Sequence, residues 1–510
     1  MGFKKLFAVI ICLIISLPAF SADVWVNDLR NLFLSNGAII YAVNMRTFGA
    51  QDTNSDGIID EDEESGNFLN AIGRLDEIQA MGINTLHLLP IMETGKTHAL
   101  GTAGSLYAPS SFNKLNPQLK SRRSMISVKN QAIKFINEAH KRNIRIIIDV
   151  PACGSYDLYS KRPELFLKDA TGQPISPLDW KDVLLFNAGD ETNINQNVLN
   201  LYKEFVDCVI SLGADGIRAD VAHSKPAAFW KELIQYSRRK DPQFMWLAES
   251  SQNWKDPISK EISSTPYNKL LEAGFDGFYG AYGEMKDWRK ASDLMSQVKF
   301  TNSLKHKFTE PKSVIGSFTT HDEMSPVLIN GINYSEMILW LNSTLPLNAY
   351  YVDGFPTGDT YIYLYGNKTA RSTSTDDDKY FVHRGKIDIF NFSRKPEGKF
   401  ESFRNDFMYG NGFKNTSARI IANGKYTELK TGNSEVFAYA MSYEKTTILV
   451  CGNMNFRNPN NATIKIRHFK PEMMVIPIKI KNAPIAGNGT FSVKLDAGEI
   501  QVVMINEFDI

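Results

Sequence analysis

The sequence predicts a (β/α)8 barrel of the TIM type followed by a smaller all-β domain, and three observations lead to this prediction. Short apolar runs rich in β-branched residues alternate with longer helical patterns from residue 38 to residue 352. Eight such runs occur in order, which is the number of strands in this barrel. After about residue 415, short β-rich runs between Asn, Gly and Pro turns are typical of a β-sandwich.

The expected barrel elements share either β-branched runs or helical periodicity. The expected strands are Ala38–Val43, Ile83–Leu89, Ile144–Val150, Asp215–Ala219, Phe244–Ala248, Phe275–Tyr279, Ser313–Phe318 and Asn348–Val352. The helical patterns include Leu69–Met81, Val128–Arg142, Val198–Leu212, Ala227–Arg239 and Ala291–Lys305. A doubly wound open sheet is the alternative, but no G-x-G-x-x-G follows the first strand. We expect a barrel without an organic cofactor.

Two of the expected loops are unusually long: residues 91–127 after the second strand and residues 151–193 after the third. Long ordered loops are usually functional, and barrel enzymes build their sites at the carboxyl ends of the strands. The C-terminal β-rich runs are Arg419–Ala422, Ser434–Tyr439, Thr447–Val450, Thr463–Ile466, Val475–Ile480 and Ile500–Ile505. We therefore expect a barrel domain over residues 22–414, which includes both loops, and a β-sandwich domain over residues 415–510.

The beginning of the chain predicts export. Lys4 and Lys5 precede an apolar run over residues 6–20, and residues 19–21 offer small side chains at the −3 and −1 positions of a cleavage site. An uncleaved anchor is the alternative, but the run is shorter than the roughly 20 residues of a spanning helix. We expect a signal peptide over residues 1–21, a secreted or periplasmic protein, and no stable membrane insertion after cleavage.

Overall composition narrows the possible partners and the sources of stability. Of 510 residues, 43% are hydrophobic and 22% charged, which is ordinary for a globular protein. The formal net charge of +1 gives no indication of nucleic acid as a partner. Three cysteines lie beyond the signal peptide, and their odd number and wide spacing fit neither a disulfide framework nor a zinc site.

Three carboxylates stand at or just after expected strand ends. Asp220 follows Arg218 at the end of the fourth strand, Glu249 ends the fifth, and Asp322 follows His321 at the end of the seventh. A barrel gathers these ends at one mouth. Glycoside cleavage needs one carboxylate to attack the anomeric carbon and one carboxylic acid to protonate the leaving oxygen. Singly, each residue is more often an N-cap or an ion-pair partner, so their joint order carries the prediction.

The environment of two carboxylates suggests how their tasks divide. Arg218 is expected to keep Asp220 ionised and oriented, as a nucleophile requires. Glu249 follows the apolar residues Trp246, Leu247 and Ala248. A less polar setting raises the pKa of a carboxylic acid, as a general acid requires near neutral pH.

This order of motifs resembles glycoside hydrolase family 13, the α-amylase family. The G-x-R-x-D region matches Gly216–Asp220, the strand-end glutamate matches Glu249, and F-x-x-N-H-D matches Phe318–Asp322 with Thr in place of Asn. The first region, D-V-V-x-N-H, is partly matched by Asp149–Gly154, and the opening strand resembles Ile40–Phe48. The resemblance spans roughly residues 38–352.

The resemblance implies a retaining mechanism through a covalent glycosyl-enzyme. Asp220 would then be the nucleophile and Glu249 the general acid/base, while Asp322 would bind hydroxyls of the strained sugar in the −1 subsite. Arg218, His321, Asp149 and Tyr107 would also belong to the substrate-binding site, with His321 hydrogen-bonded to the sugar. Tyr107 resembles the tyrosine whose ring stacks on the −1 sugar; packing is the alternative role for a loop tyrosine.

Two positions depart from the family pattern. Gly154 and Ser224 stand where many members have histidines, although His223 is adjacent to the second position. A missing donor removes a hydrogen bond worth roughly 1–3 kcal/mol. We expect a −1 subsite that depends less on that wall, and tighter binding of a pseudo-sugar when Gly154→His restores an imidazole.

A calcium site is expected in the loop after the first strand. Residues 52–60 place side-chain oxygen atoms at alternate positions with glycine at the turn, which is half of an EF-hand-like pattern. A solvated acidic turn is the alternative. The expected structural Ca²⁺ ligands are the side chains of Asp52, Asn54, Asp56 and Asp60 and the carbonyl of Ile58.

The first functional hypothesis is a retaining glycosidase that cleaves α-glucosidic bonds of α-glucans or malto-oligosaccharides. The second is a 4-α-glucanotransferase of the same fold, favoured slightly by Pro151, which resembles the proline of glucanotransferase relatives. The third is a carbohydrate-binding protein without catalysis. Bond preference, substrate length and oligomeric state stay open.

Overall fold

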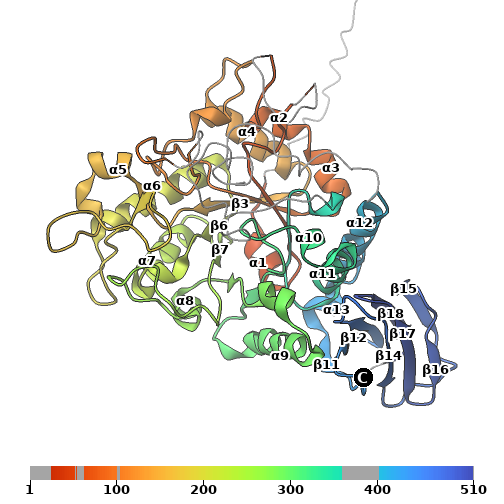
Figure 1. Ribbon diagram of the computed structural model, residues 1–510. Coiled ribbons are helices and arrows are strands. Elements are labelled where there is room, and N and C mark those ends of the chain that lie inside the picture. The colour runs from red at the N-terminus through yellow and green to blue at the C-terminus, as the bar shows by residue number, and fades with distance from the viewer. Residues whose placement is uncertain (1–24, 52, 54–61, 100–103, 359–400, 509–510) are drawn as a thin grey trace, which may run out of the picture.

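The computed structural model describes residues 25–51, 53, 62–99, 104–358 and 401–508 (Figure 1). Its largest sheet has eight parallel strands in the order β10-β1-β2-β3-β6-β7-β8-β9. The two outer strands are joined by a parallel bridge between Ile315 and Asn348, so the sheet closes into a barrel. The predicted fold is confirmed, and each of the eight predicted runs contains one barrel strand.

The barrel strands are short and enter the ring in chain order. They are β1 (Ile39–Val43), β2 (Thr85–Leu88), β3 (Arg145–Val150), β6 (Gly216–Ala219), β7 (Met245–Ala248), β8 (Gly277–Phe278), β9 (Ser313–Val314) and β10 (Ala349–Val352).

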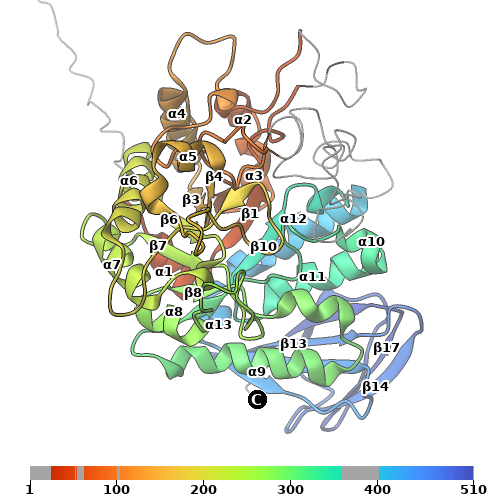
Figure 2. The same ribbon diagram turned by 60° about the vertical axis from the view of Figure 1, so that its left-hand side comes forward.

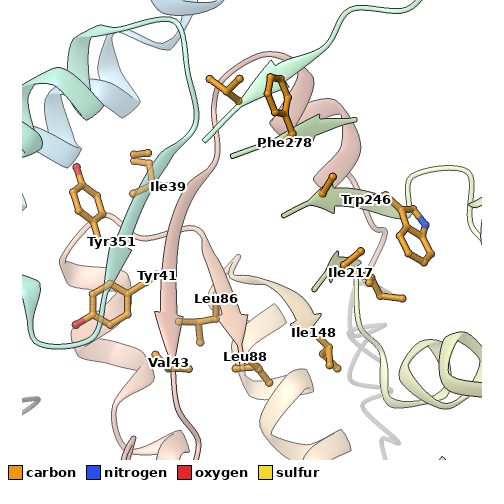
Figure 3. Close-up of a cluster of buried hydrophobic side chains, with 14 of the residues drawn as sticks. Ile39, Tyr41, Val43, Leu86, Leu88, Ile148, Ile217, Trp246, Phe278 and Tyr351 are labelled. Atoms are coloured by element: carbon orange, nitrogen blue, oxygen red, sulfur yellow. The ribbon is translucent and has the colours of Figure 1, made fainter. Parts of the chain in front are cut away.

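Alternate side chains of these strands enter two different layers. One set, which includes Leu86, Ile148, Ile217 and Trp246, packs between the strands and the surrounding helices, and Figure 3 shows these side chains on the outside of the strand ring. The other set fills the barrel interior with Ile40, Ala42, Ile147, Met245 and Leu247. Burial on both faces explains why these strands are apolar runs without polar alternation.

The short helix α1 (Leu29–Leu34) packs its apolar side chains into this interior layer. Leu29 and Phe33 belong to the same buried cluster as the inward side chains. A Cβ atom at Gly216 would lie 3.2 Å from Leu29 Cδ2, and one at Gly277 would lie 2.6 Å from Phe33 Cε1. Glycine at both strand starts therefore allows α1 to approach the barrel closely.

The remaining helices surround the strands (Figures 1 and 2). The α-helices are α2 (Phe68–Ile72), α3 (Leu75–Ala80), α4 (Val128–His140), α5 (Tyr156–Lys161), α6 (Gln196–Leu212), α7 (Ala227–Arg238), α8 (Tyr267–Ala273), α9 (Ala291–Lys307), α10 (Pro326–Asn330), α11 (Ile332–Thr344), α12 (Glu401–Thr416) and α13 (Ala418–Asn423). The short 3-10 helices are η1 (Pro117–Leu119), η2 (Pro163–Leu165), η3 (Ala222–Ser224), η4 (Tyr282–Asp287) and η5 (Phe355–Thr357). The predicted helix Leu69–Met81 is divided into α2 and α3 at Gly73, a poor helix former.

The long chain segment after β3 has structure of its own. It contains the two-stranded sheet of β4 (Gly154–Ser155) and β5 (Val183–Leu184), together with α5 and η2. Leu178 N–H donates to the Ile258 carbonyl at 3.0 Å, which ties this segment to the loop after β7. Two loops from different strand ends thus form one wall above the barrel.

The C-terminal domain consists of two antiparallel sheets. One has the order β11-β12-β13-β18-β15 and the other β14-β17-β16. The strands are β11 (Lys425–Glu428), β12 (Val436–Tyr443), β13 (Thr446–Asn453), β14 (Asn460–Lys465), β15 (Val475–Lys479), β16 (Ile485–Gly487), β17 (Thr490–Leu495) and β18 (Ile500–Asn506). The sheets enclose a separate apolar core, as a β-sandwich does.

Strand β12 is buried on both faces and joins the two domains. Ala438 and Ala440 point into the sandwich core, whereas Phe437 and Tyr439 belong to the core shared with the barrel helices. The Tyr439 hydroxyl lies 2.6 Å from Thr344 Oγ1 at the end of α11. Figures 1 and 2 show this domain beside α9 and α11.

One predicted strand is wrong and the predicted domain limit falls inside a helix. Arg419–Ala422 lies in α13, since a four-residue apolar run also fits one helical turn and periodicity alone cannot distinguish the two. Helix α12 continues from the barrel side through Thr416, and the first strand of the sandwich begins at Lys425. The limit expected at residues 414 and 415 therefore lies within α12.

The first described residues are fastened to the amino-terminal end of the barrel. Trp25 stacks on His140 with ring centroids 4.0 Å apart, and its Nε1–H donates to Asp215 at 2.8 Å. The Asn27 side chain donates to Asp241 at 2.6 Å. The predicted signal peptide lies outside the described residues, so export stays a prediction. None of the helices in the described ranges is long and apolar enough to span a membrane.

We predict that Trp25→Ala lowers the free energy of unfolding by about 1–3 kcal/mol, because it removes a stacked ring and a hydrogen bond. Urea denaturation measures this change. Val26→Ala is the matched control, since Val26 is 77% exposed and its truncation should change stability by less than about 0.5 kcal/mol. Equal effects of the two substitutions would contradict a specific role of Trp25.

Candidate active site

A cavity of about 410 Å³ opens at the carboxyl ends of the barrel strands. Asp220 follows β6, Glu249 follows β7, and Asp322 lies in the segment after β9. All three carboxylates line the cavity. The structure thus brings together the three residues that the sequence predicts for catalysis, although Asp220 and Asp322 lie more than one hundred positions apart. Their positions follow from barrel closure, which turns every strand end toward one mouth.

Arg218 occupies the centre of this group and is fully buried. Its Nη1 donates to Asp149 Oδ1 at 2.8 Å and to Asp220 Oδ1 at 2.9 Å. Its Nη2 lies 2.9 Å from Glu249 Oε1, in an ion pair, and its Nε donates to the Tyr279 hydroxyl at 3.0 Å. One guanidinium therefore holds both candidate reacting carboxylates and a third carboxylate below them.

Tyr107 and His321 extend this hydrogen-bond network. The Tyr107 hydroxyl donates to Asp149 Oδ2 at 2.7 Å and lies 2.8 Å from His321 Nε2. The two rings are parallel, with centroids 5.9 Å apart, and His321 Nε2 is 3.4 Å from Asp322 Oδ2. Tyr107 also lines the cavity. All predicted substrate-binding residues are thus connected, with Asp149 buried beneath the cavity.

The backbone after Asp220 is strained in a way that orients Glu249. Val221 has a φ of 39°, a left-handed conformation that is rare for a β-branched residue. In this conformation its N–H donates to Glu249 Oε2 at 2.6 Å, and Ala222 N–H donates to the Glu249 carbonyl at 3.1 Å. On the other side, Ala152 N–H donates to Asp220 Oδ2 at 2.9 Å. Backbone donors therefore fix both carboxylates.

Burial dominates the electrostatics of the cavity. It raises the pKa of Asp220 to about 8, because the Arg218 charge does not offset burial together with the negative charges of Glu249 and Asp149. Burial likewise raises the pKa of Glu249, and it raises the pKa of Asp322 to about 7. Asp149 differs: burial raises its pKa, but Arg218 and the His87 and Tyr107 contacts lower it below its ordinary value.

These pKa directions bear on the roles expected from the sequence. The raised pKa of Glu249 has the direction that a general acid needs. For Asp220, Arg218 lowers the pKa, as expected, but burial and the neighbouring carboxylates Glu249 and Asp149 raise it by more. The carboxylate that Arg218 keeps ionised is Asp149.

The surroundings of Gly154 leave little room for the imidazole of Gly154→His, and the expected tighter binding of a pseudo-sugar stays a prediction. Gly154 pairs with Leu184 in the small sheet, and a Cβ atom there would lie 2.8 Å from Cζ of both Phe166 and Phe186. A larger side chain would therefore collide with buried aromatic rings. Cys153, one residue earlier, lines the cavity instead. Residue 154 cannot supply a contact to a sugar without rearrangement of this aromatic cluster.

At Ser224, the second position that departs from the family pattern, the adjacent residue His223 faces the cavity instead. His223 lines the cavity, whereas Ser224 Oγ is buried. Burial lowers the pKa of His223 to about 4, so its imidazole is neutral near pH 7. His223, one position before Ser224, therefore supplies an imidazole to this wall of the cavity.

Several cavity residues were not predicted from the sequence. Trp254, on the loop after β7, is 42% exposed and meets His223 edge to face at 6.1 Å. Lys286 lies in η4, and its Nζ donates to Glu323 Oε2 at 2.7 Å at the cavity rim. These residues come from segments without a recognisable motif, so no local signal could have identified them. Trp180, in the long segment after β3, also lines the cavity.

The predicted calcium ligands lie outside the described residues. Asp52, Asn54, Asp56, Ile58 and Asp60 all fall in the part of the loop that the structure does not describe. Elsewhere, residues 25–51, 62–99, 104–358 and 401–508 contain no group of three or more His, Cys, Asp or Glu side chains placed to hold a metal ion. The three described cysteines are free thiols.

Comparison with known proteins relates the chain to enzymes of α-glucans. No protein-family model matches it. "Alpha-amylase MalA" of Haloarcula japonica is 22% identical over 275 residues, covering 51% of this chain and 35% of that protein. The α-1,4-glucan:maltose-1-phosphate maltosyltransferase of Picrophilus torridus is 24% identical over 427 residues, covering 79% of this chain and 60% of that protein. The chain thus spans less than two thirds of these relatives.

A solved structure shows the same fold over nearly the whole chain. It is the noncanonic maltogenic α-amylase AmyB from Thermotoga neapolitana, with a TM-score of 0.67 and 18% identity. The match covers 93% of this chain and all of that one. The match therefore includes both the barrel and the C-terminal domain.

We predict that Asp322→Asn makes the protein more stable than wild type at pH 8 and leaves stability unchanged near pH 4. The folded pKa of Asp322 is about 7, above its ordinary value, so its contribution to stability is present below the ordinary pKa and lost as the pH rises through 7. The gain at pH 8 should be about 1–3 kcal/mol.

Urea denaturation at the two pH values measures this difference. Asp256→Asn is the control, because Asp256 is exposed on the loop after β7 and its substitution should change stability by less than about 0.5 kcal/mol. A gain at pH 8 that is equal in both variants, or missing in Asp322→Asn, would contradict the raised pKa.

Proposed function

Since the chain is a relative of the α-amylase family, glycoside hydrolase family 13, we propose that it cleaves α-glucosidic bonds of α-glucans or malto-oligosaccharides with retention of configuration. One observation carries the proposal: Asp220 and Glu249 are held on the same Arg218 guanidinium and both line the cavity. Retaining glycosidases need two carboxyl groups this close, one as nucleophile and the other as acid and then base.

The proposed reaction assigns each group a step. Asp220 attacks the anomeric carbon, and the bond to the leaving oxygen breaks as Glu249 donates its proton to that oxygen. Glu249 then removes a proton from the incoming water or sugar hydroxyl, which attacks the same carbon and frees Asp220. Hydrogen bonds from Arg218 and Ala152 to Asp220 favour its ionised form when the pair shares one proton.

The cavity wall supports an α-glucan as the substrate. Tyr107, Trp180 and Trp254 all line the cavity together with the three carboxylates, the two tryptophans from the loops after β3 and β7. Flat aromatic faces suit the apolar faces of pyranose rings. Asp322, next to His321, is available to accept hydrogen bonds from sugar hydroxyls.

A glucanotransferase remains the second candidate, and the same site supports it. The covalent intermediate can be released by water or by a sugar hydroxyl, and only the acceptor differs. Trp254 is 42% exposed at the rim, where an aromatic ring can hold an acceptor sugar against the intermediate. The maltosyltransferase relative belongs to this reaction class by its name.

We predict that the purified protein changes the length distribution of maltoheptaose and that Asp220→Asn lowers kcat by about 10⁴-fold, since the nucleophile is removed. Chromatography of the products decides between the reactions. Shorter sugars alone indicate hydrolysis, and longer and shorter sugars together indicate transfer.

The control for this experiment is the stability of Asp220→Asn, which should remain folded. Binding of maltoheptaose without any change of length would instead support a carbohydrate-binding protein. Full activity of folded Asp220→Asn would place the nucleophile elsewhere and contradict the retaining mechanism.

We propose in addition that residues 52–60 bind a structural calcium ion, on the basis of the alternating oxygen ligands in the sequence. Because a ligand that binds only the native state stabilises it, calcium at a hundredfold excess over Kd should add about 2.7 kcal/mol. We therefore predict a higher Tm with calcium and a lower Tm with a chelator. Identical melting curves, with no metal found by elemental analysis, would make the segment an acidic turn only.

A further inference from the structure

His87 is an ionisable side chain placed in the interior of the barrel. It lies in the middle of β2 and is fully buried. Register places it opposite Ala42 of β1 and Ile147 of β3, whose side chains belong to the apolar interior layer. An apolar side chain would therefore suit packing at this position, so the imidazole needs another explanation.

The polar groups around His87 come from several strands. Its Nδ1 lies 2.9 Å from the Tyr350 hydroxyl on β10, and its Nε2 lies 3.3 Å from Asp149 Oδ2 on β3. The His321 ring meets it edge to face at 6.2 Å. Arg218, which shares Asp149 with it, is the nearby cation. His87 is thus connected to the active site through Asp149 and has no place in the cavity lining.

These contacts select one tautomer of His87. Burial lowers the pKa of His87, which Asp149 raises and Arg218 lowers, so the ring is neutral and carries a single N–H. Asp149 is ionised and can only accept hydrogen bonds. The proton therefore belongs on Nε2, facing Asp149, while Nδ1 accepts the hydrogen bond that the Tyr350 hydroxyl donates.

We propose that His87 is a positioning residue that holds Asp149 against Arg218, and through it sets Arg218 between Asp220 and Glu249, with Tyr350 fixing the required tautomer. The catalytic consequence rests on the function proposed above. The remaining contacts of Asp149 explain the effect. Arg218 Nη1 is shared between Asp149 and Asp220, so rotation of the Asp149 carboxylate changes the direction of the bond to Asp220.

The test compares four variants at 25 °C with maltoheptaose as the substrate. His87→Phe removes the donor, whereas His87→Gln retains a donor that can reach Asp149. Tyr350→Phe leaves His87 but removes the group that fixes its tautomer. His140→Phe is the matched control, because His140 is another buried histidine beside an aspartate, 2.9 Å from Asp215 at the opposite end of the barrel.

Small displacements of reacting groups reduce turnover strongly. We therefore expect His87→Phe to lower kcat by about tenfold or more, while its KM stays within about twofold of the wild-type value. His87→Gln should recover most of the lost kcat, and Tyr350→Phe should have an intermediate effect. His140→Phe should lower the Tm while kcat at 25 °C stays near that of the wild type.

A second measurement does not depend on activity. The ¹⁵N NMR signals of the His87 imidazole should report the Nε2–H tautomer in the wild type and a mixture in Tyr350→Phe. The His87 resonances are assigned by their disappearance from the spectrum of His87→Gln, which lacks this imidazole.

Three results would overturn the inference: unchanged kcat in folded His87→Phe, an equal loss of kcat in His140→Phe, or a proton on Nδ1 in the wild type. A wild-type protein that changes neither the length nor the linkage of maltoheptaose would overturn the proposed function and the catalytic effect of His87 with it. The NMR measurement would still decide the tautomer on its own.

Discussion

The buried positive charge of Arg218 is the interaction on which the rest of the site depends. A guanidinium without water must be paired, and the barrel supplies carboxylates from three neighbouring strands: Asp149, Asp220 and Glu249. Asp149 already pairs with this guanidinium, so Asp220 and Glu249 share the stabilisation that the same positive charge can still give. Their raised pKa values follow from this competition under burial. The site therefore shares one cation among more anions than it can neutralise.

The position of this charged layer is set by the layers beneath it. Ile147, Met245 and Leu247 fill the barrel interior, and Leu29 and Phe33 of α1 belong to the same apolar cluster. The charged residues Asp149 and Arg218 lie toward the carboxyl ends of β3 and β6. An apolar interior on one side strengthens the electrostatic interactions in the layer above it. The fold thus contributes a low-dielectric floor, while the loops after β3 and β7 contribute the wall that is open to solvent.

Strand positions and the main carboxylates could be predicted because both depend on local sequence signals. Buried parallel strands are continuous apolar runs, and Asp220 and Glu249 directly follow two of them. Features without such signals were missed. The space around Gly154 is filled by the rings of Phe166 and Phe186, which a local pattern does not reveal. The cavity positions of Trp254 and Lys286 depend on how long segments fold over one another. His87 could not be recognised either, because its partners Asp149 and Tyr350 meet only when the barrel closes.

The docking of the first described residues also has a consequence for the order of folding. Trp25 contacts Asp215, Asn27 contacts Asp241, and Arg30 pairs with Asp276, so each contact closes a loop of about two hundred residues or more. Such contacts form late, since the entropy of loop closure must be overcome before they add stability. During synthesis, residues 25–30 cannot all be docked until residue 276 is available. The amino-terminal segment is therefore among the first parts of the barrel to be made and among the last to be fixed in place.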